Sequence, residues 1–286
     1  MKRILIFGEN SYIGTHFLEY LKDDDNYIID TIDSKGTEWR KYDFSRYDVV
    51  YHVAGIAHVS SNPKMEEIYY KINRDLPIEV AQKAKNENVK QFIFMSSMII
   101  YGKDGEIGQK KNITATTDAN PSDFYGKSKW EADVAIQNMK SNNFKPVVIR
   151  TPMVYGRNCK GNFPKLIKLA KYTFIFPNIE NQRSMIYIEN LCQFLKQIID
   201  NECVGIFYPQ NKEYVSTKDI IMQIAKITRK KIIFTKIFNP LLKLLSKKIS
   251  YINKIFGNKT YDKNTSRDYQ YCIVDFEESI RRSIEK

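Results

Sequence analysis

The stretch Lys-Arg-Ile-Leu-Ile-Phe-Gly-Glu-Asn-Ser-Tyr-Ile-Gly, residues 2–14, decides the fold. Its apolar run is typical of a buried strand that ends at Gly8, and a helix is predicted from Tyr12 onward. A glycine directly after a strand permits a tight turn, and the helix that follows points its first backbone amides at a bound phosphate. The stretch therefore predicts a dinucleotide-binding turn, with these contacts to the cofactor: Gly8, Ser11, Tyr12, Ile13 and Gly14.

The end of the second predicted strand bears on the choice of cofactor. Asp33 lies nineteen residues beyond Gly14, where a carboxylate can accept hydrogen bonds from the adenosine ribose. This position favours NAD. Ser34, Lys35 and Arg40 follow at once and could accommodate the additional phosphate of NADP, so NAD and NADP both stay open.

Two further strand ends are expected on the cofactor side of the sheet. One is predicted at Asp43 and Phe44, and the other at Ala54 and Gly55, whose small side chains would let the dinucleotide pass close to the backbone. We predict that all four contact the cofactor. His58 follows directly and is interpreted either as structural or as close to the substrate.

The order of the predicted elements indicates the fold class. Short β-rich runs alternate with helical stretches through the first half of the chain, which is the pattern of a parallel sheet with crossover helices. We predict an α/β, Rossmann-type doubly wound sheet over residues 1–155, with a later return near 184–200. Residues 156–286 are predicted to form mainly a smaller substrate-binding lobe. The polar stretch 102–123 is expected to be a loop.

The predicted strands and helices of this arrangement are as follows. The strands are Arg3–Phe7, Tyr27–Ile32, Asp48–Val53, Gln91–Ser96 and Pro146–Arg150. The helices are Tyr12–Lys22, Leu76–Asn86 and Tyr125–Asn142 in the first part, and helices near Phe163–Lys171, Ile188–Ile199 and Thr217–Ile227 in the second.

The segment Tyr-Gly-Lys-Ser-Lys, residues 125–129, carries the clearest sign of chemistry. Tyr125 and Lys129 are four residues apart, so on a helix they share a face and the ammonium can favour the ionised phenol. An unperturbed tyrosine titrates near pH 10, and a lower pKa would make Tyr125 a usable proton donor and acceptor. Lys129 can also hold the ribose next to the nicotinamide.

The order of these motifs along the chain resembles the extended short-chain dehydrogenases, the nucleotide-sugar epimerase/dehydratase family. The resemblance runs from Lys2 to about Leu191, and Ser11 stands where the family's glycine motif has its middle glycine. It implies that Ser97 hydrogen-bonds the reacting sugar oxygen, that Tyr125 exchanges its proton, and that a nicotinamide exchanges hydride with ring carbon 4.

The residues after Ser97 argue against one reaction of this family. Its 4,6-dehydratases carry Asp-Glu at that point, because elimination of water needs an acid and a base. Here Met98 and Ile99 occupy those places and cannot move protons. Met98 is instead expected to contact the substrate, and redox chemistry at carbon 4 is what remains.

The resemblance also indicates the substrate. It implies that Asn162 and Arg183 face the nucleotide diphosphate, a task that suits a guanidinium because its donors form a planar fork. A surface salt bridge is the alternative for Arg183. The leading specific hypothesis is reduction of a UDP-2-acetamido-2,6-dideoxy-4-keto-hexose for a bacterial capsule or O-antigen. The alternatives are 4-epimerisation of a UDP-N-acetylhexosamine or UDP-glucose and, more distantly, a dinucleotide-binding regulator or RNA-associated protein without turnover.

The composition narrows the class of protein further. The 286 residues carry a formal net charge of +12, and much of this excess falls from Arg229 onward. No RNA-reading aromatic motif accompanies the charge, so a nucleic-acid partner is not expected. The four cysteines have no metal-ligand spacing, which predicts free thiols, no metal site and a cytoplasmic location. The family resemblance suggests a homodimer through the helix 125–142.

Two features of the sequence bear on membrane contact. No apolar stretch approaches the length of about 20 residues that spans a bilayer. Residues 238–256 place apolar side chains at helical spacing with lysines between them, a pattern that can lie on a membrane surface. We expect instead that this segment packs on its own lobe with the lysines solvated.

Overall fold

The computed structural model describes residues 1–57, 62–266 and 269–285, and its chain divides into two units. The first unit comprises Met1–Gly102, Asp118–Thr151 and Leu191–Pro209. The second comprises Lys103–Thr117, Pro152–Asn190 and Gln210–Lys286. His58, which the sequence left as structural or close to the substrate, lies outside the described residues.

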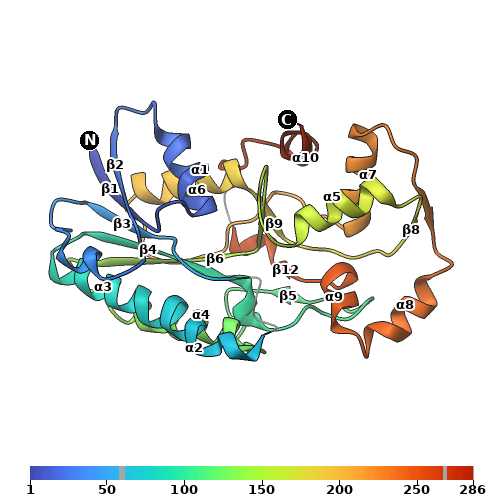
Figure 1. Cartoon of the computed structure of the whole chain (residues 1–286), viewed down its shortest axis with the longest axis horizontal. Helices are drawn as coiled ribbons and strands as arrows, with labels where there is room; N and C mark the ends of the chain where they lie inside the picture. The colour runs from blue at the N-terminus through green and yellow to red at the C-terminus, as the bar shows by residue number, and fades with distance from the viewer. Residues whose placement is uncertain (58–61, 267–268, 286) are drawn as a thin grey trace. The chain divides into compact units, whose positions relative to one another are not determined.

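The first unit is built on a parallel sheet of six strands (Figure 1). Their order is β2-β1-β3-β4-β6-β10, so the chain reverses its direction of winding between β1 and β3. In open α/β sheets, ligands bind outside the carboxyl ends of the strands at this switch point. The strands are β1 (Lys2–Phe7), β2 (Tyr27–Ile32), β3 (Val49–His52), β4 (Gln91–Ser97), β6 (Lys145–Thr151) and β10 (Gly205–Phe207).

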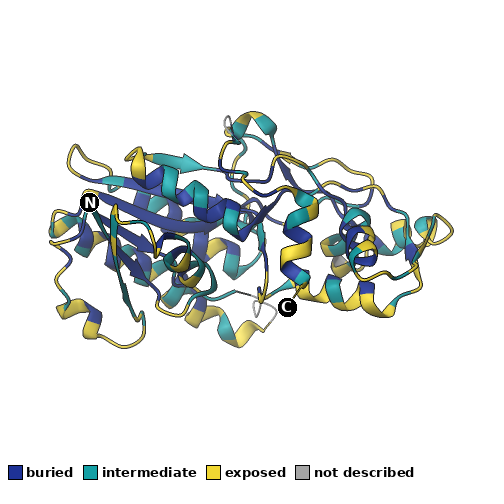
Figure 2. Ribbon diagram, turned by 90° about the horizontal axis from the view of Figure 1, so that it is seen from above, coloured by how far each residue is buried: buried dark blue, intermediate teal, exposed yellow. Residues whose placement is uncertain are grey.

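Helices cover both faces of this sheet (Figure 1). On one face lie α1 (Tyr12–Leu21) and α6 (Ile188–Asp200). On the other lie α2 (Glu66–Tyr70), a π-helical turn (Lys71–Asp75), α3 (Leu76–Asn86) and α4 (Phe124–Gln137). Burial on both faces explains why β1, β3 and β4 read as nearly continuous apolar runs (Figure 2). The α/β fold class predicted from the sequence is therefore confirmed.

Two predictions about elements of the first unit were wrong. No strand among the described residues ends at Asp43 and Phe44: Glu38–Lys41 is a short 3-10 helix instead. Asp43 accepts hydrogen bonds from the Ser45 backbone and hydroxyl at 2.9 and 2.6 Å, a local turn that competes with strand pairing. Helix α4 ends at Gln137, five residues before the predicted Asn142, because the chain turns back so that Ser141 bridges Phe144.

The second unit combines small two-stranded sheets with helices. Its strands pair as β5 (Asn112–Ile113) with β12 (Thr260–Tyr261), β7 (Met153–Tyr155) with β9 (Met185–Tyr187), and β8 (Ile175–Pro177) with β11 (Ile233–Thr235). Its helices are α5 (Asn162–Tyr172), α7 (Thr217–Ile227), α8 (Asn239–Ser246), α9 (Ser250–Phe256) and α10 (Phe276–Ile284). A buried centre forms where the Tyr155 phenol meets the Ser279 hydroxyl at 2.6 Å and accepts from Asn211 at 3.0 Å.

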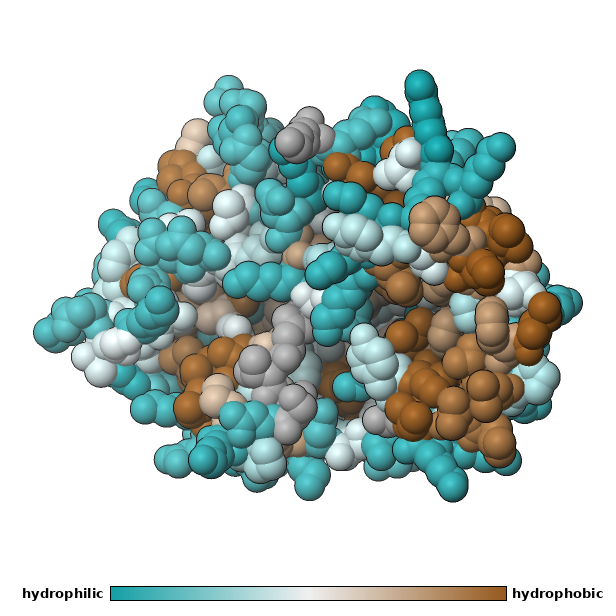
Figure 3. All heavy atoms as spheres, turned by 45° about the vertical axis from the view of Figure 1, so that its right-hand side comes forward, coloured by the Kyte–Doolittle hydropathy of each residue, from teal (hydrophilic) through white to brown (hydrophobic). Residues whose placement is uncertain are grey.

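The basic segment 238–256 differs from the prediction. It forms two helices, α8 and α9, with a break after Ser246. The lysines are exposed as expected, but Leu241 and Leu244 are also 58% and 64% exposed, so the apolar residues of α8 do not all pack on their own lobe. Figure 3 shows a broad apolar area on the side of the second unit. Among the described helices, none has the length and apolar character needed to cross a membrane.

Candidate functional site

Ser97 and Tyr125 meet in the first unit. Ser97 is the last residue of β4, and Tyr125 lies in the first turn of α4, which Asp123 caps by accepting from the Gly126 amide at 2.8 Å. The Ser97 hydroxyl donates a hydrogen bond to the phenol of Tyr125, and this bond lowers the pKa of the phenol. Burial acts more strongly in the opposite direction and raises the pKa of Tyr125 to about 12.

Lys129 lies one helical turn beyond Tyr125 and is buried. Its ammonium donates to the Met95 carbonyl at 2.8 Å and lies 4.7 Å from the centre of the Phe94 ring. Burial lowers the pKa of Lys129 to about 8, while nearby Asp133 opposes this shift. The expectation that this ammonium lowers the pKa of Tyr125 is therefore wrong for the ligand-free protein, because the ammonium is held by a backbone carbonyl and the phenol remains protonated.

The absence of a side chain at Gly126 lets Tyr125 approach Ser97. A Cβ at this position would lie 2.9 Å from the Pro121 Cβ and 3.1 Å from the Ile99 carbonyl oxygen. Both distances are shorter than ordinary carbon contacts, so a larger residue would push the start of α4 away from the segment after β4. The glycine of the Tyr-Gly-Lys-Ser-Lys segment thus positions the phenol.

A buried ion pair fixes the elements that carry these side chains. Arg150 on β6 binds Asp133 on α4 through two hydrogen bonds of 3.0 and 2.9 Å, and the two side chains are 6% and 0% exposed. Asp133 also accepts from the Ser96 hydroxyl at 2.7 Å. Arg150 donates to the Tyr101 phenol at 2.7 Å. The network joins β4, β6 and α4 directly behind Ser97.

The predicted dinucleotide turn forms a cradle that excludes side chains. Gly8 has φ +127°, and a Cβ there would lie 2.7 Å from the Ala54 backbone nitrogen. Ser11 caps α1 with φ −70° and accepts from the Gly14 amide at 3.2 Å, which leaves its hydroxyl proton available to a phosphate oxygen. Tyr12 and Ile13 follow in the first turn of α1. The turn at the sheet's switch point therefore fits the pyrophosphate of a dinucleotide.

The surroundings of Asp33 and Arg40 bear on the choice between NAD and NADP. Phe7 and Ile32 are partners across β1 and β2, so Gly8 and Asp33 follow neighbouring strand ends, and Asp33 is exposed there. Arg40, the candidate partner for the NADP phosphate, instead binds Glu79 through two donors at 2.5 and 2.7 Å. A guanidinium committed to a carboxylate is a poorer partner for a second anion.

The other predicted cofactor contacts differ in their placement. Ala54 and Gly55 follow β3 beside Gly8, where the prediction put them. Asp43 and Phe44 lie in the loop before β3, and the Phe44 ring is fully buried in the core. That burial makes Phe44 a packing residue in this structure.

Asn73 is a site residue that the sequence reasoning missed. It is fully buried in the π-helical turn, and its side-chain amide binds both the amide and the carbonyl of Ile56 at 2.9 Å. A Cβ on Gly55 would lie 3.1 Å from the Asn73 oxygen and 3.4 Å from the Lys129 nitrogen. Asn73 thus holds the loop after β3 against Lys129. Its place on the buried stripe of a helix, three residues before Leu76 and seven before Val80, is the signal that could have revealed it.

The predicted substrate residues fall in both units. Met98 follows Ser97 and is 7% exposed. Asn162 is the exposed first residue of α5 in the second unit. Arg183, also in the second unit, donates to the Asp104 carboxylate at 3.0 Å and to the Asn253 carbonyl at 2.9 Å. It therefore forms a salt bridge, but the two side chains are only 14% and 17% exposed, so this is not the surface salt bridge given as the alternative. Lys259 lies 3.9 Å from the same carboxylate.

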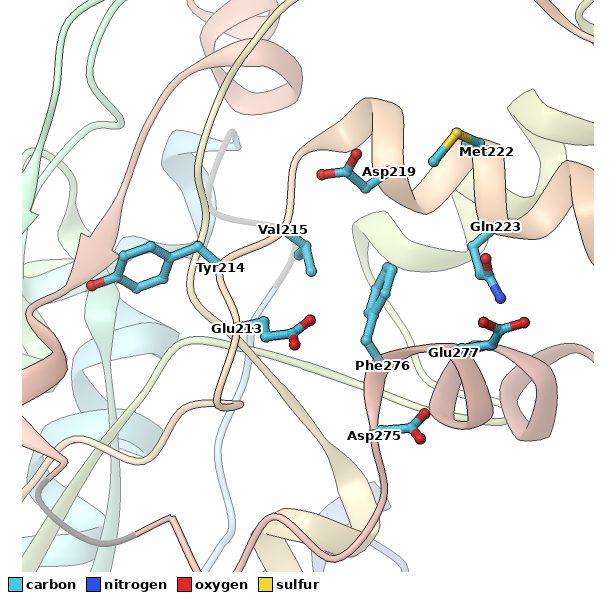
Figure 4. A pocket seen from close by; sticks show the side chains of 9 residues that line it. All are labelled: Glu213, Tyr214, Val215, Asp219, Met222, Gln223, Asp275, Phe276 and Glu277. Carbon is cyan, nitrogen blue, oxygen red and sulfur yellow. The ribbon is translucent and has the colours of Figure 1, made fainter.

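A hollow of about 490 Å³ lies elsewhere in the second unit, between α7 and the start of α10 (Figure 4). Its wall carries four carboxylates. Asp219 and Asp275 cap these two helices, and Glu277 pairs with Lys226 at 2.6 Å. Helix capping or ion pairing thus explains the presence of three of the four carboxylates, and Glu213 is the fourth.

A comparison with protein families supports the interpretation of this site. Residues 4–207 match the NAD dependent epimerase/dehydratase family, and the chain belongs to it. It is therefore an enzyme of the extended short-chain dehydrogenase class, in a family described as NAD dependent, as the sequence predicted.

Individual relatives point the same way. The chain is 27% identical over 250 residues to a UDP-glucose 4-epimerase of Vibrio cholerae, which covers 78% of this chain and 75% of that one. It is 24% identical over 291 residues to an N-acetyl-alpha-D-glucosaminyl-diphospho-ditrans,octacis-undecaprenol 4-epimerase of Escherichia coli O157:H7, with 95% and 86% covered. The fold matches a UDP-glucuronic acid 4-epimerase of Bacillus cereus in complex with NAD, with TM-score 0.76, 20% identity, and 98% and 94% covered.

Proposed function

We propose that this enzyme is an NAD-dependent 4-epimerase of a UDP-activated hexose or N-acetylhexosamine. The observation that carries the proposal is the hydrogen-bonded pair of Ser97 and Tyr125 beside buried Lys129. The pair can exchange one proton with one sugar hydroxyl, and the apolar side chains of Met98 and Ile99 supply no second acid and base for dehydration. Two relatives with printed 4-epimerase activities support the choice of reaction.

The roles of the residues follow from this arrangement. Ser97 orients the sugar oxygen at carbon 4. Tyr125 would have to lose its own proton first, which the positive charges of an oxidised nicotinamide and of a released Lys129 beside it would favour, and it would then accept the proton of that hydroxyl and later return it. A bound nicotinamide supplies the acceptor and donor of hydride. Lys129, once released from the Met95 carbonyl, holds the adjacent ribose. Asp33 binds the adenosine ribose, and the commitment of Arg40 to Glu79 supports NAD over NADP.

The substrate diphosphate is assigned to the second unit. Arg183 and Lys259 both lie near the Asp104 carboxylate, and the planar fork of donors on Arg183 suits the oxygens of a diphosphate. Asn162 offers a side-chain amide at the start of α5. We further propose a cytoplasmic enzyme that forms a homodimer through α4, as the family resemblance suggests.

The test separates epimerase from reductase. The purified protein is denatured, and any released nicotinamide is identified by chromatography. It is also incubated with UDP-N-acetylglucosamine and with UDP-glucose without added cofactor. We expect retained NAD and a 4-epimeric product. If the enzyme instead oxidises added NADH or NADPH in the presence of a UDP-4-keto sugar and shows no epimerisation, this proposal is wrong. The enzyme is then the reductase that was the leading hypothesis from the sequence.

The Tyr125→Phe variant tests the proposed acid. It keeps the ring and deletes the proton, so we expect turnover to fall by about a hundredfold or more. Tyr20→Phe is the matched control, because Tyr20 lies on α1, on the face of the sheet opposite α4, and its phenol donates to Gln193 on α6 at 2.6 Å. Unchanged turnover in Tyr125→Phe would exclude this phenol from the reaction.

A further inference from the structure

The small sheet of β8 and β11 is apolar on both of its faces. Phe176 is buried on the inner face and packs edge-on against Phe234 with ring centres 6.2 Å apart. On the outer face, Ile175 and Ile233 are direct partners in the pairing and are 49% and 65% exposed. A sheet with one solvated face normally carries polar side chains there.

Helix α8 shows the same departure from an ordinary surface helix. Leu242 and Leu245 point inward and are partly buried. Leu241 and Leu244 lie at the edge of the same apolar stripe and are 58% and 64% exposed, and Ile237 just before the helix is 81% exposed. A surface helix normally buries its apolar stripe, so the exposed part of this stripe is the departure.

These outer side chains form one surface, which we call the apolar face. The Asn178 amide donates to the Thr235 carbonyl at 2.8 Å, and the Asn239 side chain donates to the Asn178 carbonyl at 2.8 Å, so the sheet edge is tied to the start of α8. Figure 3 shows apolar side chains gathered on this side of the unit. The apolar face consists of Phe174, Ile175, Ile233, Ile237, Leu241 and Leu244.

The two segments that carry the apolar face are basic. Residues 229–259 contain nine lysines and arginines and no acidic residue, and residues 157–179 contain no acidic residue either. Lys236, Lys243, Lys247 and Lys248 are exposed around α8. The ammonium of Lys230 lies 4.6 Å from the centre of the Phe174 ring. Lysines whose stems lie along apolar surface can keep their ammonium groups at a polar boundary.

We propose that the apolar face binds an anionic lipid bilayer, with its leucines and isoleucines in the outer acyl region and the surrounding lysines at the headgroup phosphates. Each lysine near an anionic membrane surface adds to the attraction, and the short α8 lies in the plane of the interface. A second copy of this chain is a poorer occupant, because it would bring two basic rims together. The inference is independent of the proposed reaction.

Vesicle sedimentation tests the proposal with the full chain. Vesicles of phosphatidylcholine alone are compared with vesicles of equal parts phosphatidylcholine and phosphatidylglycerol. We expect binding to the anionic vesicles that weakens with added salt. The double variant Leu241→Glu/Leu244→Glu should reduce binding by roughly tenfold or more, because it places carboxylates in the acyl region. Lys243→Gln/Lys247→Gln/Lys248→Gln should also weaken it and does not alter apolar packing.

The control carries the same charge change outside the apolar face. Met222→Glu/Ile273→Glu replaces side chains that are 47% and 52% exposed, and it should sediment with anionic vesicles as the unmodified chain does. Turnover of a soluble UDP-sugar should be unchanged in the leucine variant. The proposal is overturned by absence of vesicle binding, by equal binding to both vesicle types, or by a dimer in lipid-free solution that Leu241→Glu/Leu244→Glu converts to monomer.

Discussion

Lys129 carries a measurable cost of burial in the ligand-free protein. Its pKa is about 8 in the folded chain against 10.5 for a solvated lysine, so between these values the unfolded chain binds the proton that the folded chain has lost. Stability contributed by this residue therefore rises with pH across that window. Compared with a Lys129→Met variant, we expect the unmodified protein to gain about 2 kcal/mol in free energy of unfolding from pH 7 to pH 9.5.

Urea unfolding at the two pH values measures this difference. All other titrating groups are common to both proteins, so their contributions cancel in the comparison. An equal change with pH in both proteins would show that the ammonium of Lys129 is solvated in the folded state. Tyr125 does not interfere, since its raised pKa of about 12 acts only at higher pH.

At the scale of residues, spacing along the chain predicts which side chains lie close together better than it predicts where each side chain points. Tyr125 and Lys129 are four residues apart on a helix and therefore share a face, and Ser97 at the end of β4 lies next to the phenol. The grouping of these three side chains could therefore be predicted. The bond from Lys129 to the Met95 carbonyl depends on contacts between elements far apart in sequence, and the pKa expected for Tyr125 was wrong for that reason. Asn73 escaped because a single buried asparagine in a helix has several structural explanations.

At the scale of elements, the ion pair of Asp133 and Arg150 joins α4 to the sheet. We expect Asp133→Asn to lower the free energy of unfolding by about 3 to 5 kcal/mol, because it leaves the guanidinium buried without its counter-charge. Glu131→Gln is the matched control on the same helix. Its partner Arg74 is 35% exposed, so the cost should stay within about 0.5 kcal/mol.

Chemical denaturation monitored by far-UV circular dichroism measures both variants. A cost for Asp133→Asn as small as that of Glu131→Gln would mean that α4 is held by apolar packing alone. Residual turnover of the folded Asp133→Asn protein is a second readout, since Ser97 and Tyr125 depend on the same junction.

The strands of the sheet and the helices beside it could be predicted from the sequence, because the spacing of apolar residues and the length of each segment indicate the same element. β2 and α3 have the predicted bounds. The segment before β3 could not be read, because Trp39 and Phe44 are both buried although Asp43 between them makes a turn with Ser45. The end of α4 was placed too late, since a local bridge between Ser141 and Phe144 competes with further helix.

At the scale of the whole molecule, the two units are predicted to divide cofactor and substrate between them. Hydrogen exchange measured by mass spectrometry can test this on the full chain, because a bound ligand slows exchange where it closes local openings. With NAD, compared with protein from which any retained cofactor has been removed, we expect slower exchange over residues 8–14 and 53–57 of the first unit. With UDP alone we expect slower exchange around Asn162 and Arg183 of the second unit.

A single glycine separates the two responses. Gly8→Ala adds a Cβ that would lie 2.7 Å from the Ala54 nitrogen, at a φ of +127° that alanine rarely adopts. The variant should lose the protection by NAD and keep the protection by UDP, because its damage is confined to the turn after β1. Protection by UDP confined to the first unit would contradict the proposed division of cofactor and substrate between the units. Loss of both responses would mean that the variant misfolds. The exchange pattern of the sheet without added ligand detects such misfolding directly.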